Sequence, residues 1–232
     1  MRPRGYPTPL ARSAWKSARW LVIAPHADDE TLGAGALIRE AAADGRLGGV
    51  VILTDGAGSH ASGEHGFTAR LVSERRREAR GALRSLAGRA ACRPEFLDWP
   101  DAHPPAPGDP LWDRSLRRLA WIVRGRRIDA IAVTSLADAH CDHQAAARLA
   151  RAAVARALRP VALFEYHVWS HPDATARSGY ASRPLRAGMR AGALARHRSQ
   201  TSALFGPGFR LPREPSLAAR SDRLYPVTVP HG

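Results

Sequence analysis

Two short segments of the sequence combine histidine and aspartate in a way that suits metal chemistry. Residues 25–30 read Pro-His-Ala-Asp-Asp-Glu, and residues 140–143 read His-Cys-Asp-His. One aspartate of each segment could simply cap a helix, which would leave exposed histidines with no role. Capping does not explain His26 together with two adjacent acids, because neighbouring carboxylates repel each other unless a cation lies between them.

Taken together, the two segments supply the donor atoms of a catalytic metal site. Two histidine nitrogens and one aspartate oxygen form the three-ligand set of catalytic zinc, which leaves one position open for water. The acid and the histidine that remain could act as general base and general acid in a hydrolysis.

The elements that must position these residues follow from the hydrophobic pattern. Short apolar runs rich in β-forming residues alternate with segments of helical period, which favours βαβ units and a mainly parallel sheet. We expect an α/β fold, a Rossmann-like three-layer α/β/α sandwich. The predicted strands are residues 20–24, 50–54, 95–99, 128–134 and 161–168, and the predicted helices are residues 32–43, 67–86, 111–123 and 144–158.

Each predicted strand is followed by polar residues. Ligands of open parallel sheets bind beyond the carboxyl ends of the strands, so the two histidine-aspartate segments should meet at one edge of the sheet. Residues 1–18 are predicted to form an irregular basic arm, residues 19–204 a single α/β domain, and residues 205–232 a covering C-terminal tail rich in proline and arginine.

The two motifs, in this order and about four βα units apart, resemble those of the PIG-L (LmbE-like) N-acetylglucosaminyl deacetylase family. That family has a His-Pro-Asp-Asp-Glu motif after its first strand and a His-x-Asp-His motif after a later one. Weaker similarity covers most of residues 20–202, including the segments 54–56, 75–78, 97–101 and 197–200.

The resemblance implies a role for each matching residue. His26, Asp29 and His143 would bind zinc, one ion per chain, and Asp28 would be the general base toward metal-activated water. His140 would be the protonated partner of the oxyanion or the leaving amine, with Asp142 orienting it. Arg75 and Asp101 would hold the sugar hydroxyls; Arg75 lies in a run of three arginines, so a solvated helix face is an equal alternative for it.

Four positions depart from the family pattern. Ala27 replaces a proline, and Cys141 stands where proline is common, although adjacent residues seldom both reach one ion. Arg190 replaces a lysine, which keeps the charge but not the geometry. Asp138 stands where some sugar deacetylases of this type have a tyrosine that polarises the carbonyl. This departure bears on the identity of the substrate more than on the type of reaction.

Composition limits the remaining possibilities. The 232 residues carry a net charge of +14, nearly all of it from arginine because Lys16 is the only lysine. The arginines are scattered and lack interleaved aromatics, which favours a solvated basic surface over a nucleic-acid site. Two cysteines, Cys92 and Cys141, are too few for a disulfide framework.

The sequence therefore predicts a cytoplasmic enzyme with no membrane span. The expected activity is zinc-dependent removal of an N-acyl group, most simply acetyl, from an amino sugar or its conjugate, so the partner would be a small glycosyl substrate. The alternative is a non-catalytic basic domain that binds anions or nucleic acid and keeps a structural metal.

Overall fold

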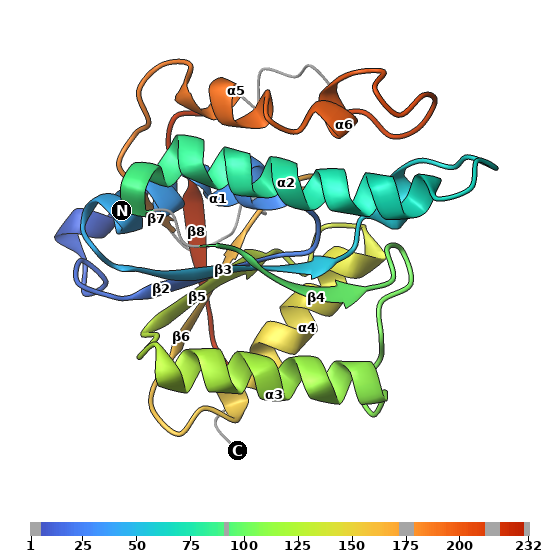
Figure 1. The fold of residues 1–232 in the computed structure, drawn as a ribbon. Helices are drawn as coiled ribbons and strands as arrows, with labels where there is room; N and C mark the ends of the chain where they lie inside the picture. Colours follow the sequence, from blue (N-terminus) through green and yellow to red (C-terminus); the bar gives the residue numbers. More distant parts are fainter. Residues whose placement is uncertain (1–5, 91–92, 172–178, 212–218, 230–232) are drawn as a thin grey trace.

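The computed structural model describes residues 6–90, 93–171, 179–211 and 219–229. Cys92 and parts of both terminal segments lie outside these residues. A single sheet of eight strands runs through the molecule in the order β1-β7-β8-β6-β5-β2-β3-β4 (Figure 1). The strands are β1 (Thr8–Pro9), β2 (Trp20–Ala24), β3 (Leu47–Thr54), β4 (Glu95–Trp99), β5 (Ala130–Thr134), β6 (Ala162–Tyr166), β7 (Tyr180–Ala181) and β8 (Arg223–Val227).

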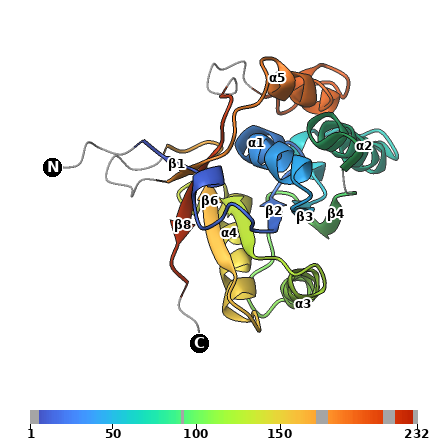
Figure 2. The same ribbon diagram turned by 90° about the vertical axis from the view of Figure 1, so that its left-hand side faces the viewer.

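Helices cover both faces of the sheet. In Figures 1 and 2, α1 and α2 lie on one face, α3 and α4 on the other, and α5 lies outside α1 and α2. The helices are α1 (Asp29–Ala43), α2 (Phe67–Ala87), α3 (Pro110–Gly125), α4 (Cys141–Ala155), α5 (Met189–Leu194) and α6 (Arg198–Thr201), with short 3-10 turns η1 (Leu10–Arg12), η2 (Ala57–Ser59) and η3 (Gly88–Ala90). The predicted three-layer α/β/α sandwich is confirmed.

Strand periodicity divides the core into two halves. Along β2, Trp20 and Val22 pack under α1 and α2, whereas Leu21 and Ile23 pack toward α3 and α4. The central strands are buried on both faces because successive side chains point to opposite sides, and this is why they read as continuous apolar runs. The pairs β2–β3, β2–β5, β3–β4 and β5–β6 are all parallel, so their carboxyl ends meet at one edge.

Helix α1 packs unusually close to the sheet. A Cβ atom on Gly33 would lie 2.2 Å from the ring of Tyr166, so only glycine allows this approach. The Tyr166 hydroxyl donates to the carbonyl of Ile23 at 2.9 Å. This contact fixes the first turns of α1, and with them Asp28 and Asp29 at its N-terminus, against the ends of β2 and β6.

Both terminal segments contribute more than the sequence predicts. Residues 8–12 form β1 and η1, with Leu10 in the core, and β8 joins the sheet antiparallel to β6 and β7. The proposed irregular arm and covering tail are therefore partly structural strands. Among the described residues, no helix is long and apolar enough to cross a membrane.

Candidate active site

The polar residues that follow the strands meet in one pocket at the carboxyl ends of the parallel strands. The cavity measures about 200 Å³. All the predicted site residues except Asp142 and His143 line it directly, and those two lie against its histidines. The lining residues are His26, Asp28, Asp29, Gly58, Ser59, Arg75, Asp101, Ala102, His140, Trp169, Gln200 and Phe209.

The three predicted metal ligands form one compact group. Asp29 Oδ2 lies 3.1 Å from His26 Nδ1 and 3.3 Å from His143 Nε2, and both Asp29 and His143 are buried. Burial alone would raise the pKa of Asp29, but the neighbouring His143 and His26 lower it well below its usual range. Burial would lower the pKa of His143, but the charge of Asp29 and a hydrogen bond to Asp138 raise it to about 9.

The donor atoms of this group fit a divalent cation. His26, Asp29 and His143 each offer one atom, all within 4.8 Å of one another. His143 Nε2 is buried and makes no hydrogen bond, although buried polar atoms are normally paired. Two imidazole nitrogens and one carboxylate oxygen are a donor set that zinc accepts, so these residues could hold one such ion.

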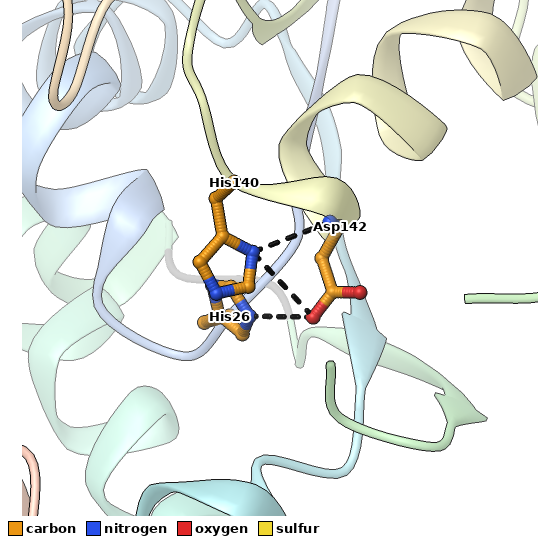
Figure 3. A group of neighbouring side chains, drawn as sticks. All are labelled: His26, His140 and Asp142. Atoms are coloured by element: carbon orange, nitrogen blue, oxygen red, sulfur yellow. Dashed lines mark hydrogen bonds and ion pairs between the residues drawn. The ribbon is translucent and has the colours of Figure 1, made fainter. Parts of the chain in front are cut away.

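A second group shares His26. His26, His140 and Asp142 also bring their donor atoms within 4.8 Å (Figure 3). The carboxylate of Asp142 lies 2.9 Å from His26 Nε2 but 3.9 Å from His140 Nδ1. Asp142 therefore contacts the proposed ligand His26 more closely than His140, the residue it was expected to orient. A carboxylate behind a metal-binding histidine fixes the orientation of the ring.

Asp28 has an unusual backbone and an unusual acidity. It is the residue before the first turn of α1, and its φ of 145° lies in a region that residues other than glycine seldom adopt. Its N–H donates to Glu30 Oε2 at 2.9 Å, which holds this conformation. Burial and the charge of Asp29 raise the pKa of Asp28 to about 7, against the lowering effect of Arg75.

His140 caps helix α4 with its own ring. The N–H of Asp142 donates to His140 Nδ1 at 3.2 Å, so that nitrogen carries no proton and the ring's hydrogen is on Nε2. Burial and the charges of His26 and His143 lower the pKa of His140. The expected protonated ring therefore does not fit this geometry, whereas a neutral ring with an Nε2–H does.

Arg75 is the one arginine of its run that reaches the pocket. It is 3 % exposed and donates to the carbonyls of Gly56 and Ala27 at 3.1 Å each, whereas Arg76 and Arg77 are much more exposed. Gly56 has φ at 72°, and a Cβ there would lie 2.7 Å from the guanidinium. The solvated-face alternative is thus wrong for Arg75.

Asp101, in the loop after β4, also lines the pocket. It accepts from the N–H of Gly58 at 3.0 Å, and its carboxylate is 3.3 Å from His26 Nε2. Although burial opposes ionisation, these contacts lower the pKa of Asp101 to about 2. The lowered pKa favours the ionised form of Asp101 at the pocket wall.

The structure also gives roles to residues that the sequence left without one. Asp138 accepts from His143 Nδ1 at 2.9 Å and is fully buried, so it backs a proposed ligand instead of facing substrate like the tyrosine it replaces. In the sequence, the position of Asp138 in the loop before His143 was the only feature that could have indicated this role. Glu30, besides holding Asp28, lies 3.6 Å from the buried ring of His197.

Two of the departures noted in the sequence prove to lie beside the site, not in it. Arg190 is buried, donates to the carbonyls of Thr31 and Leu32 in α1, and pairs with Asp222. Cys141 is exposed, and neither of the two candidate metal groups found among the described residues includes it.

Comparisons with known proteins match both the sequence and the fold of this chain. The family model of the PIG-L GlcNAc-PI de-N-acetylases matches residues 21–154, more than half of the chain, and a search of curated proteins finds no match. N,N'-diacetylchitobiose deacetylase from Pyrococcus horikoshii is 19% identical, with 93% of this chain and 86% of that chain covered and a TM-score of 0.68.

Two further solved structures show how widely the fold is used. The conserved protein TT1542 from Thermus thermophilus is 29% identical over 79% of this chain and 80% of its own, with a TM-score of 0.57. The 4-carboxy-2-hydroxymuconate hydratase from Pseudomonas putida is 21% identical over 90% and 95%, with a TM-score of 0.63. The family model covers both motifs that build the pocket, and the chain therefore belongs to the PIG-L family of GlcNAc-PI de-N-acetylases.

Proposed function

We propose that this protein is a zinc-dependent hydrolase that removes an N-acyl group, most simply acetyl, from an amino sugar or an amino-sugar conjugate. The observation that carries the proposal is the group His26, Asp29 and His143 next to a second carboxylate, Asp28, which lines the pocket together with His26 and Asp29. A purely structural metal needs no adjacent base, which weighs against the alternative of a non-catalytic basic domain.

The proposed reaction breaks the amide C–N bond and joins the oxygen of water to the carbonyl carbon, releasing a carboxylate and an amine. Zinc, when held by His26, Asp29 and His143, supplies a Lewis acid that polarises the amide carbonyl. Asp28 accepts the proton of the attacking water, and its pKa of about 7 suits a base that works near neutral pH. His140 donates a hydrogen bond from Nε2 to the oxyanion. Asp28 then passes the proton taken from water to the departing nitrogen, so that the amine can leave.

The other pocket residues are proposed to orient and bind. Asp142 and Asp138 fix the rings of His26 and His143 through the contacts described above. Arg75 and Asp101 line the pocket and are proposed to bind the sugar hydroxyls, since one donates and the other accepts hydrogen bonds.

The test is amine release from a panel of N-acetyl amino sugars and conjugates, assayed with zinc-loaded and metal-stripped protein. We expect release that depends on the metal and returns when zinc is added back. Release that is unaffected by stripping would reject the metal, and no release from any substrate would reject the deacetylase.

The same assay also separates the proposal from other uses of the fold. A hydratase shares this fold, and such an enzyme would add water to a substrate without releasing an amine. A non-catalytic basic domain would instead stay on heparin at about 0.5 M salt, where nonspecific phosphate binding is already weak.

A further inference from the structure

Two exposed aromatic side chains stand at the rim of the pocket. Trp169 is 42% exposed and Phe209 is 45% exposed, and their ring centroids are 6.3 Å apart at an interplanar angle of 84°. Both line the pocket that holds Asp28 and two of the proposed metal ligands, His26 and Asp29. The other large exposed apolar side chains of the described residues do not line this pocket: Tyr6, Trp121, Leu136, Leu158 and Leu204.

Trp169 is held in place by the same carboxylate that backs a proposed metal ligand. The backbone N–H groups of its two neighbours, Val168 and Ser170, donate to Asp138 at 3.3 Å and 2.9 Å. Asp138 also accepts from His143 Nδ1. The position of Trp169 relative to His143 is therefore set by one buried side chain.

Phe209 is fixed from the other side. Its N–H donates to the carbonyl of Ser59 at 2.8 Å, and the N–H of Leu211 donates to the carbonyl of Gln200 at 2.8 Å. Ser59 and Gln200 themselves line the pocket. Both rings are thus held at the mouth by backbone bonds, although neither contributes to the hydrophobic core.

The pocket therefore has two chemically different parts. Its polar part carries Asp28, Asp29, His26 and His140, and its aromatic part consists of Trp169 and Phe209. An aromatic surface kept exposed next to a polar site is typical of recognition of an apolar group.

We propose that Trp169 and Phe209 bind an apolar substituent of the substrate, so that the substrate is an amphiphilic amino-sugar conjugate and not a free sugar. The inference rests on the proposed function, because the polar part must receive the sugar amide. The substituent has two possible sources with the same chemistry: the aglycone, or an N-acyl chain longer than acetyl.

The experiment compares three substrates of the zinc-loaded full chain by amine release. They are the methyl glycoside of N-acetylglucosamine, its hexyl glycoside, and the methyl glycoside of N-hexanoylglucosamine, all kept below the concentration at which they self-associate. We expect one of the two apolar substrates to exceed the methyl N-acetyl compound in kcat/KM by about 10-fold or more. Which one it is identifies the source.

The matched variants are Trp169→Ala, Phe209→Ala and, as control, Trp121→Ala. Trp121 is also an exposed tryptophan, at 51%, but it lies on α3 beside Arg118. The preference ratio should fall close to one in Trp169→Ala, fall in Phe209→Ala, and stay unchanged in Trp121→Ala.

Failure of this inference can be told from failure of the proposed function. Equal kcat/KM for all three substrates, or a ratio that survives Trp169→Ala, would overturn the inference and leave the deacetylase intact. If no substrate released amine, the proposed function would fail, and calorimetric binding of the hexyl and methyl glycosides would decide the inference: tighter hexyl binding that Trp169→Ala removes supports it, and equal binding overturns it.

Discussion

Carboxylates lie at both ends of the parallel strands, and their partners differ. At the amino ends each carboxylate pairs with arginine: Asp44 with Arg46 and Arg183, Glu95 with Arg118 and Arg126, and Asp129 with Arg159. At the carboxyl ends, four aspartates each lie within 4 Å of a histidine nitrogen, namely Asp29, Asp101, Asp138 and Asp142, and a fifth, Asp28, lines the same pocket. Among the described residues, Arg75 is the single arginine within 4 Å of any of them.

This difference separates charged groups that stabilise the fold from charged groups whose burial destabilises it. The amino-end pairs are partly exposed, and such pairs contribute about 1 kcal/mol or less each. The carboxyl-end aspartates are mostly buried, where an unpaired charge is strongly unfavourable. Several carboxylates clustered in a buried environment are typical of a site that binds a cation and transfers protons.

The largest effect should come from removing a proposed metal ligand. His26→Ala, Asp29→Ala and His143→Ala should each lower zinc affinity by more than about 100-fold, because even residues behind metal ligands cost 10- to 100-fold, and should abolish metal-dependent amine release. The control is His65→Ala, at an exposed histidine outside the pocket. Full zinc occupancy in all three folded variants, measured by metal analysis and circular dichroism, would reject the ligand set.

The second effect compares the same substitution at the two ends of the sheet. Asp28→Asn keeps the shape of the side chain but cannot accept the proton of water, so kcat should fall about 100-fold or more while zinc stays bound. Asp44→Asn, in an arginine-paired carboxylate, should keep kcat. The measurement is kcat with metal content determined on the same samples.

Either of two results would remove this distinction. An Asp28→Asn protein that keeps most of its rate with zinc present would exclude Asp28 as the base, even if the zinc site is correct. A large loss of kcat in Asp44→Asn would mean that the amino end also affects catalysis.

The central fold and the pocket could be predicted because their signals are local. Strands buried on both faces appear as unbroken apolar runs, and polar residues follow them directly, so the meeting of His26 with His143 required only the parallel order of the strands. The start of α4 was missed by one turn, because the cap is the ring of His140, and histidine is not a usual capping residue.

Contacts that join distant segments could not be predicted. Strand β8 contains Pro226, which argues against a strand. Pro226 has a strand neighbour on one side only, Phe164 of β6, because β7 pairs only with Arg223 and Leu224. The position of β8 depends on Asp222, which accepts from the N–H of Leu37 in α1 and pairs with Arg190. Nothing local in the sequence indicates such a contact, and the same holds for the closer approach of Asp142 to His26 than to His140.

The smallest effect concerns the stability of the arginine-paired end. Although its slight burial opposes ionisation, hydrogen bonds from Arg183 and Arg46 lower the pKa of Asp44 below its usual value. A lowered folded-state pKa gives stability that is present above the unfolded pKa of about 3.9 and is lost as the pH falls through the folded value. Asp44→Asn should therefore lower the free energy of unfolding by about 1 kcal/mol or less at pH 7, since the pair is partly exposed, and by progressively less below about pH 4. Urea unfolding of both proteins between pH 7 and pH 3 measures this difference, and a difference that persists at pH 3 would assign it to packing instead of charge.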